Sequence, residues 1–291
     1  MEIGLGLPNA IRGVDAATLL DWAREGDRGG FSTVATTDRI VYPSYESLTV
    51  LAAAAAVTER CRLTTAILLA PLRETALLAK QAASVDRLSG GRLTLGLAVG
   101  ARPDDFRATG ADHGRRGATL DDQLGELRRI WGGERRGIAG GIGPEPATPG
   151  GPPIVLGGHS PRAVARAAKY GDGWISGSGG PGMFAGGAAA FRAAWEKEGR
   201  RGRPRLLGLA YFALGQDARE NATAYVNDYY GFAPPYAAHV LSHVAVGEAR
   251  VAATLGAFAR AGCDELILAP CTADLEQVKL LRAVIDGRPG S

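Results

Sequence analysis

The sequence has little cysteine, histidine or lysine, and no long hydrophobic run. Its three cysteines, Cys61, Cys263 and Cys271, lack the Cys-x-x-Cys spacing of metal and redox sites, so we expect buried free thiols. No stretch approaches the ~18 uninterrupted apolar residues of a membrane-spanning helix, and the first residues lack the basic and apolar regions of a signal peptide. We therefore expect a cytoplasmic protein with no membrane contact.

An excess of one charge sign is also missing. The 33 basic and 30 acidic residues give a formal net charge of +3. Nucleic-acid-binding proteins gather basic residues on one face, which this composition does not indicate, so we expect no nucleic-acid partner. His239 and His243 are four residues apart on a predicted helix, but two ligands without a third are a weak signal, and we predict no metal site.

What the sequence does have is a repeated strand and helix pattern. Residues 62–69 are apolar and β-branched, residues 74–88 place Leu78, Ala82 and Val85 on one helical face, and residues 92–100 form a second apolar run. The helix between the two strands ends at a Ser-Gly-Gly sequence, so the second strand returns parallel to the first through a right-handed crossover. This βαβ unit predicts a parallel sheet.

The same order continues along the chain. Strands are expected at residues 3–7, 33–37, 62–69, 93–99, 153–156, 173–176, 206–214 and 265–268, and each precedes a helical pattern. Later helices are expected at 121–131, 162–170, 188–198 and 275–285. About eight such units, in a chain close to the ~250 residues of a (β/α)8 TIM barrel, predict that α/β fold. A doubly wound sheet is disfavoured because no Gly-x-Gly-x-x-Gly sequence opens the first helix.

We interpret residues 1–291 as a single barrel domain with one long interruption. Of the 22 residues at 132–153, 13 are glycine or proline, which disfavours any helix or strand. We expect a mobile surface loop there, which could be a lid or an idle insertion.

Barrel enzymes keep their chemistry on the loops that follow the strands. Asp38 and Arg39 follow the second predicted strand with Tyr42 close behind, and Asn9 follows the first. We take Asp38 and Arg39 as candidate catalytic residues, and Tyr42 and Asn9 as candidate substrate-pocket residues. The alternative for Asp38 and Arg39 is an ordinary surface ion pair.

Two later strands carry further candidates. Gly100 permits close backbone approach and Arg102 suits a phosphate or a carboxylate, so both are candidate cofactor ligands, although Arg102 could instead be a solvated loop residue. Trp174 lies in the sixth predicted strand, and its ring could line the pocket or pack in the core.

The fifth predicted strand ends in an anion-site pattern. Gly157 and Gly158 precede His159, Ser160 stands at the N-cap position and Pro161 at the first helical position. Free N–H groups and the positive end of the helix dipole would then face the barrel mouth, as in phosphate sites. The alternative is a well-capped helix without a ligand, and His159 could contact the anion or fill the turn.

The sequence resembles the bacterial luciferase-like superfamily of flavin- and deazaflavin-dependent oxidoreductases. The resemblance lies in residues 58–66, 78–92 and 152–158 and in Asp172-Gly-Trp174, and it extends from Gly4 to about Trp174. It implies a reduced flavin across the barrel mouth, with its phosphate at residues 157–160 and its ring against the end of the third strand. Relatives have a non-proline cis peptide at that strand end, and the match places Thr65, Ala66 and Ile67 there, with the cis bond between Ala66 and Ile67.

The resemblance implies an oxidoreductase, and we favour a monooxygenase that uses reduced FMN and dioxygen on a small organic substrate. The reduced flavin would come from a separate reductase. The alternatives are a hydride-transfer enzyme that uses a deazaflavin coenzyme, with its own reductase, and a non-catalytic flavin-binding protein. Several relatives carry a catalytic histidine at or next to the position of Arg39, and arginine does not deprotonate near neutral pH. Relatives also pair through early barrel helices, so we expect a homodimer that uses the alanine-rich residues 51–57.

Overall fold

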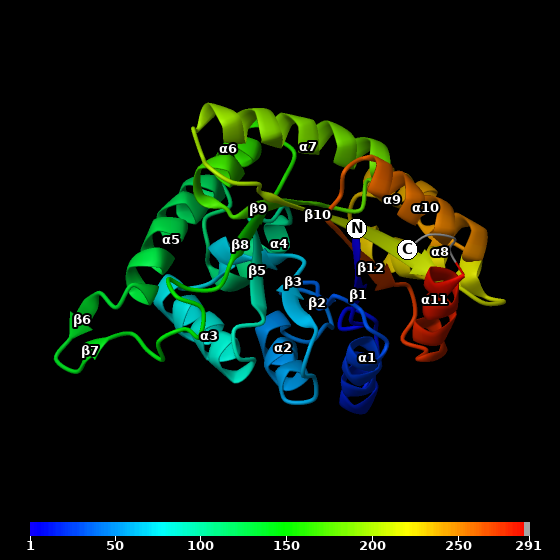
Figure 1. Ribbon diagram of the computed structural model, residues 1–291, viewed down its shortest axis with the longest axis horizontal. Helices are drawn as coiled ribbons and strands as arrows, with labels where there is room; N and C mark the ends of the chain where they lie inside the picture. The colour runs from blue at the N-terminus through cyan, green and yellow to red at the C-terminus, as the bar shows by residue number, and fades with distance from the viewer. Residues whose placement is uncertain (288–291) are drawn as a thin grey trace.

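A closed barrel of parallel strands forms the centre of the computed structural model, which describes residues 1–287 (Figure 1). Within that range its eight strands are β1 (Glu2–Gly6), β2 (Thr33–Thr36), β3 (Arg62–Thr65), β5 (Leu93–Ala98), β8 (Ile154–Gly157), β9 (Gly173–Ser176), β10 (Arg205–Ala213) and β12 (Glu265–Pro270). Neighbours in this order pair in parallel, including β9 with β10 and β10 with β12. The last strand, β12, pairs in parallel with the first, β1, so the sheet closes on itself. The predicted TIM barrel is confirmed.

Helices surround the barrel, as Figure 1 shows. They are α1 (Ala16–Arg28), α2 (Ser47–Ala55), α3 (Thr75–Leu88), α4 (Pro103–Thr109), α5 (Arg116–Trp131), α6 (Pro161–Tyr170), α7 (Gly180–Lys197), α8 (Ala218–Tyr230), α9 (Pro234–His243), α10 (Glu248–Arg260) and α11 (Glu276–Asp286). A 3-10 turn occupies Ala70–Leu72. The predicted N-cap Ser160 is confirmed, because its side chain accepts a hydrogen bond from the Ala163 N–H.

Helix α7 begins at Gly180, earlier than the predicted start at residue 188. Its first half is rich in glycine, which has a low helix propensity, so the sequence alone does not indicate a helix there. Packing overrides this, since Phe184 and Phe191 are completely buried. Gly187 allows a close approach, because a Cβ atom at that position would lie 2.4 Å from the Trp174 ring.

Alternation along β10 shows how the sheet divides its side chains. Leu206 and Phe212 pack outward against the helices, whereas Leu207, Leu209 and Tyr211 point into the barrel. This period of two is the ordinary pleat of a strand. It places a tyrosine at the carboxyl end of the barrel.

Two short strands join the barrel beside its main ladder. β4 (Leu68–Leu69) pairs with β5, and β11 (Ala245–Val246) pairs with β10. The gap between β3 and β4 holds Ala66 and Ile67, whose peptide bond is cis. The predicted position of that bond is confirmed.

The prediction of a segment without strands at residues 132–153 is wrong. β6 (Arg135–Gly137) and β7 (Gly140–Gly141) pair there as an antiparallel hairpin, which projects at the left of Figure 1. Gly140 has φ +116°, a conformation that side chains disfavour, so glycine permits the tight turn. Asp86 accepts a hydrogen bond from the Thr148 N–H at 2.8 Å and ties the base of the segment to α3.

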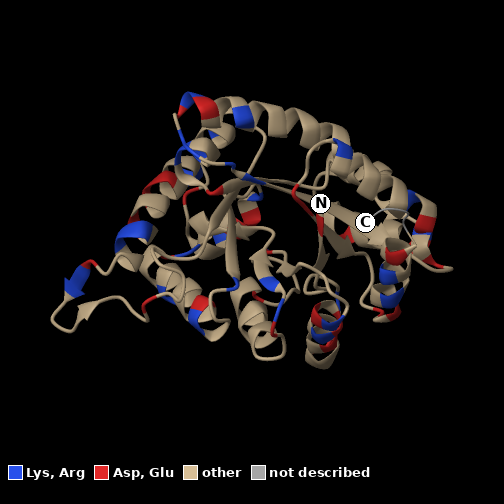
Figure 2. Cartoon of the chain, viewed as in Figure 1, with Lys and Arg blue, Asp and Glu red and all other residues tan. Residues whose placement is uncertain are grey.

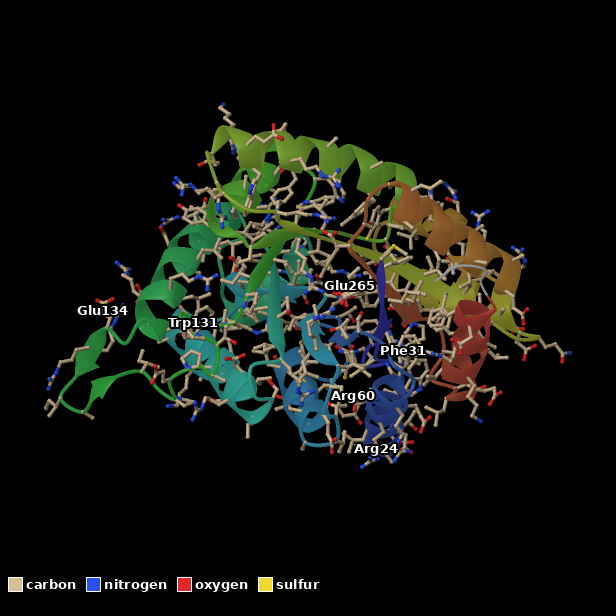
Figure 3. All side chains as sticks on the ribbon, in the orientation of Figure 1. Arg24, Phe31, Arg60, Trp131, Glu134 and Glu265 are labelled. Atoms are coloured by element: carbon tan, nitrogen blue, oxygen red, sulfur yellow. The ribbon has the colours of Figure 1, made fainter. Side chains whose placement is uncertain are left out.

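The opposite end of the barrel, where the strands begin, is closed by a buried ion-pair network. Glu265 is completely buried, in the interior where Figure 3 labels it. It lies 3.0 Å from Arg62 and 2.6 Å from Arg205, and it accepts a hydrogen bond from Ser32. On the outside, acidic and basic residues lie side by side on helices such as α1 (Figure 2). Among residues 1–287, no helix is both long enough and apolar enough to span a membrane.

Candidate active site

A cavity of about 230 Å³ opens at the carboxyl ends of the strands. Loops after β2, β5 and β9, the β3–β4 junction, β10 and the α8–α9 hairpin all contribute to its wall. Its charged residues are Asp38, Arg39, Arg102 and Asp105, and its aromatic residues are Tyr211, Tyr229, Tyr230, Phe232 and Tyr236. Active sites of barrel enzymes lie at this end, so we take the cavity, here called the mouth cavity, as the candidate site.

Asp38 lines the mouth cavity, but its carboxylate is already engaged. One oxygen accepts from the Leu69 N–H at 2.9 Å and from Arg73 at 2.7 Å, and the other accepts from Arg73 at 2.9 Å. Arg73 also binds Glu46 at 3.0 Å. A carboxylate held in this way fixes the backbone at β4. The hydrogen bonds give Asp38 a positioning role, and its catalytic role stays a prediction. Arg73 is a partner that the sequence did not reveal.

Arg39 does not pair with Asp38, as a surface ion pair would. Its side chain is buried, donates to the Val41 carbonyl at 3.0 Å and lies 3.7 Å from Asp104 and 3.9 Å from Asp105. Asp105 is completely buried and accepts from the Val41 N–H at 2.6 Å. The Arg39 charge is therefore compensated, although its buried Nε atom has no hydrogen-bond partner.

Arg102 reaches the mouth cavity from the loop after β5. Its guanidinium lies 3.5 Å from the centre of the Phe232 ring and 5.3 Å from that of Tyr229, and it donates to the Tyr229 carbonyl. Gly100, with φ +76°, makes the turn that brings Arg102 inward. Burial, and to a smaller extent repulsion by Arg39, lowers the pKa of Arg102.

The α8–α9 hairpin covers the mouth cavity with tyrosines. The hydroxyls of Tyr211 and Tyr230 are 2.8 Å apart, and the Tyr230 hydroxyl is 3.5 Å from that of Ser178. Burial raises the pKa of Tyr230 to about 12, so its hydroxyl is neutral near pH 7 and can donate a hydrogen bond. The sequence prediction missed these residues. The available signal was the run of tyrosines at 225, 229, 230 and 236, which no local pattern tied to the barrel mouth.

The junction between β3 and β4 forms the floor of the cavity through Ala66 and Ile67. Thr65 lies beneath it and is buried, with its hydroxyl 2.8 Å from both the N and the O of Gly96. Gly157 lies next to Ile67, and a Cβ atom at 157 would come within 2.6 Å of the Ile67 Cδ1. The predicted ring-binding and phosphate-binding segments are thus brought together in space.

A second cavity, of about 470 Å³, begins at Ser160 and is here called the arginine cavity. Arg115, Arg116, Arg162 and Arg166 line it. Arg166 is paired with Asp121 at 2.6 Å, whereas the buried Arg116 Nε has no partner. Positive side chains therefore gather at the start of α6, where the helix dipole also favours an anion.

The loop that follows β5 contributes to both cavities. Val99 lines the arginine cavity, and Ala101 and Arg102 line the mouth cavity. Gly158, with φ +122°, lies close to α6, since a Cβ atom there would be 2.7 Å from that of Ala163. The mouth cavity has aromatic walls that suit a ring, and the arginine cavity has cationic side chains that suit an anionic group.

Two predicted pocket residues lie elsewhere. Trp174 takes the core-packing alternative, because the ring is completely buried and its Nε1 donates to the Gly158 carbonyl at 2.9 Å. Asn9 does not line the mouth cavity, and its buried amide binds the backbone of Thr37 through both its nitrogen and its oxygen. Both residues support loops at the mouth without lining the cavity.

Tyr42 and His159 lie next to the cavities but do not line them. Tyr42 lies behind the wall, with its ring 4.8 Å from the Arg39 guanidinium and its hydroxyl bound to Asp228. His159 stands edge-on to Trp174 at 5.2 Å, with Nε2 3.4 Å from the Ser176 hydroxyl. Its ring thus fills the turn, and burial lowers its pKa. Among residues 1–287 no group of three His, Cys, Asp or Glu side chains could hold a metal ion.

Comparison with known proteins assigns the barrel to a family. The family model described as luciferase-like monooxygenase matches residues 1–261. The chain belongs to this family. An uncharacterised protein of Mycobacterium tuberculosis is 30% identical over 187 residues, which are 55% of this chain and 65% of that protein. Pyrimidine monooxygenase RutA of Escherichia coli is 31% identical over 173 residues, which are 53% of this chain and 46% of RutA. The chain thus spans less than two thirds of these curated relatives.

Solved structures of other proteins share the whole fold. An F420-dependent secondary alcohol dehydrogenase, in complex with an F420-acetone adduct, superposes with a TM-score of 0.81 at 16% identity and covers 98% of each chain. The oxygenating constituent of 3,6-diketocamphane monooxygenase from Pseudomonas putida, in complex with FMN, gives 0.75 at 17% identity over 99% of this chain and 97% of that one. At these identities the likeness concerns the fold alone.

Proposed function

We propose that the chain is an oxidoreductase that uses reduced FMN and dioxygen to oxygenate a small organic substrate. The observation that carries this proposal is the pair of cavities that share the loop after β5. One has aromatic walls and the other has guanidinium groups at the start of a helix. Reduced FMN has two matching parts, a flat ring and a phosphate.

The residues present fit such a cofactor. At the start of α6, Pro161 has no N–H and the Ala163 N–H donates to the Ser160 side chain, so the Arg162 N–H is the one left for an anion. Arg162 lines the same cavity as Arg116, whose buried Nε has no hydrogen-bond partner. Thr65, Ala66 and Ile67 would support the ring, and residues 157–160 with Arg116 would hold the phosphate. Nothing in this assignment requires the Ser160 hydroxyl, which already caps α6.

When bound, reduced FMN supplies the electrons that activate dioxygen. The chain contributes position, exclusion of water and hydrogen bonds. Within residues 1–287 no histidine lines the mouth cavity, and an arginine side chain does not deprotonate near neutral pH. The neutral hydroxyls of Tyr211 and Tyr230 are the groups placed to donate to a substrate oxygen. The tyrosine-rich hairpin excludes water above them.

A second candidate is hydride transfer by a deazaflavin coenzyme, and the arginine cavity favours it. Four guanidinium groups line that cavity, and one of them is paired with Asp121. A single phosphate leaves positive charge unused, whereas the deazaflavin coenzyme carries carboxylates beyond its phosphate. A non-catalytic flavin-binding protein is the third possibility.

An anaerobic titration followed by air separates these functions. The purified protein is titrated with reduced FMN and, separately, with the reduced deazaflavin, and each complex is then mixed with air in a stopped-flow spectrometer. We expect reduced FMN to bind and to reoxidise at a rate different from that of free flavin. Tighter binding of the deazaflavin, unaffected by air, would replace the proposal with hydride transfer. FMN binding without any effect on its reaction with oxygen would indicate storage, and binding of neither would refute all three.

The proposal includes a separate flavin reductase and a homodimer. In residues 51–57, Leu51, Ala54 and Ala55 are buried inside the subunit, so only Ala53 and Ala56 offer an exposed alanine surface. Ala53→Arg should convert a dimer into a monomer in sedimentation at micromolar concentration. A monomeric wild-type protein would remove this part of the proposal.

A further inference from the structure

Arg102 is a buried cation without an ionic partner. Its exposed fraction is 8%, as is that of Arg39, but the two differ in compensation. Arg39 has Asp104 and Asp105 within 4.0 Å, whereas Arg102 forms no ion pair with any of residues 1–287. Its one hydrogen bond goes to the Tyr229 carbonyl. A buried charge without a counter-ion costs free energy, so this arrangement calls for an anion in the cavity.

The surroundings of Arg102 define the shape of that anion. Phe232 and Tyr229 lie against the guanidinium, and Tyr211, Tyr230 and Tyr236 complete an aromatic wall. Such a wall binds flat, conjugated molecules through ring contacts. Arginine presents a planar fork of donors that matches a carboxylate or a phenolate oxygen.

The charge balance limits the anion to a single negative charge. Asp104 and Asp105 lie within 4.0 Å of Arg39, and their negative charges oppose the entry of a more highly charged group. A phosphate is better served by the arginine cavity, where several guanidinium groups meet a helix start. The two cavities therefore differ in the kind of anion they accept.

We propose that Arg102 anchors the substrate through one carboxylate or phenolate group, and that the substrate is a flat aromatic or conjugated molecule. This inference rests on the proposed function, because it gives the Arg102 side of the mouth cavity to the substrate and the floor at Ala66 and Ile67 to the cofactor ring. Tyr229 holds Arg102 in position through its carbonyl, and Phe232 covers its outer face. The hydroxyl pair of Tyr211 and Tyr230 then faces the body of the substrate.

Binding of two matched probes tests this assignment. 2-Naphthoate and 2-naphthalenemethanol share one ring system and differ in charge, and their affinities can be measured by calorimetry with and without oxidised FMN. For the wild-type protein we expect the acid to bind at least about tenfold more tightly than the alcohol. Arg102→Gln should abolish that preference, and Arg102→Lys should retain part of it. Thermal unfolding of each variant checks that it is folded.

Arg116→Gln is the matched control, because it removes from the other cavity the arginine that would hold the phosphate. It should weaken FMN binding and leave the preference for naphthoate unchanged, whereas Arg102→Gln should do the reverse. An equal affinity for acid and alcohol in the wild type would overturn the inference. So would a loss of FMN affinity in Arg102→Gln, because Arg102 would then belong to the cofactor. If FMN fails to bind while naphthoate keeps its preference, the proposed function fails and the anion subsite stands.

Discussion

The two ends of the barrel treat buried charge differently. Where the strands begin, Glu265 is enclosed by Arg62 and Arg205, so each buried charge meets an opposite one. Where the strands end, Arg102 is buried among aromatic rings with no acidic partner among residues 1–287. From this difference we infer that compensated charges stabilise the fold, whereas the uncompensated charge of Arg102 belongs to a ligand site. Asp38 follows the first rule although it lies at the mouth, since Arg73 neutralises it.

The largest expected effect comes from breaking the network at the strand starts. Glu265→Gln leaves Arg62 and Arg205 without their buried partner, so unfolding in urea should become easier by about 3–5 kcal/mol. Glu2→Gln is the matched control, because Glu2 binds the same arginines from a half-exposed position, and it should cost less than ~1 kcal/mol. Equal losses in the two variants would contradict the role assigned to burial.

A smaller effect is expected at Asp38. Asp38→Asn removes the charge that binds Arg73 and should lower the free energy of unfolding by about 2 kcal/mol. Glu46→Gln tests the exposed arm of the same arginine and should cost less than ~1 kcal/mol. If Asp38→Asn kept full stability and lost turnover, the result would support the predicted catalytic role of Asp38.

Asp27 offers a pH-dependent test at the strand starts. Burial raises its pKa, but the N–H groups of Cys61, Glu59 and Arg60 outweigh this and lower the pKa to about 2. Because the unfolded value is near 4, the stabilisation is complete above about pH 4 and is lost as the pH falls toward about 2. Asp27 is partly exposed, so we expect only ~1–2 kcal/mol. Asp27→Asn should flatten this part of the urea-stability curve against pH, and an unchanged slope would refute the assignment.

The smallest expected change in stability is at Arg102. Replacing an uncompensated buried cation with an apolar residue removes a cost, so Arg102→Met should leave the free energy of unfolding within ~1 kcal/mol of wild type or raise it. Urea denaturation without added ligand measures this. A loss as large as that of Glu265→Gln would mean that Arg102 belongs to the fold and not to a ligand site.

The fold was predicted well because strands and helix starts depend on residues that are close together in the sequence. Apolar runs of β-branched residues became strands, and the Ser160 and Pro161 pair became a helix start. The cavity wall was harder, because Arg73 and Tyr230 reach the mouth through contacts between residues far apart in sequence. No pattern distinguishes an asparagine such as Asn9, which binds backbone, from one that faces a ligand.

In the proposed function, the mouth cavity binds the flavin ring and the arginine cavity binds its phosphate. Substitution of Ser160 tests this assignment most directly. Ser160→Asp keeps an effective N-cap for α6 but adds a negative charge to the arginine cavity, and Ser160→Asn is the neutral control. The measurement is the ratio of the dissociation constants of riboflavin and FMN, which share a ring and differ in the phosphate. We predict that wild type and Ser160→Asn prefer FMN at least about tenfold, and that Ser160→Asp loses this preference with little change in riboflavin affinity. Equal affinities in the wild-type protein, or a preference that survives Ser160→Asp, would contradict the account.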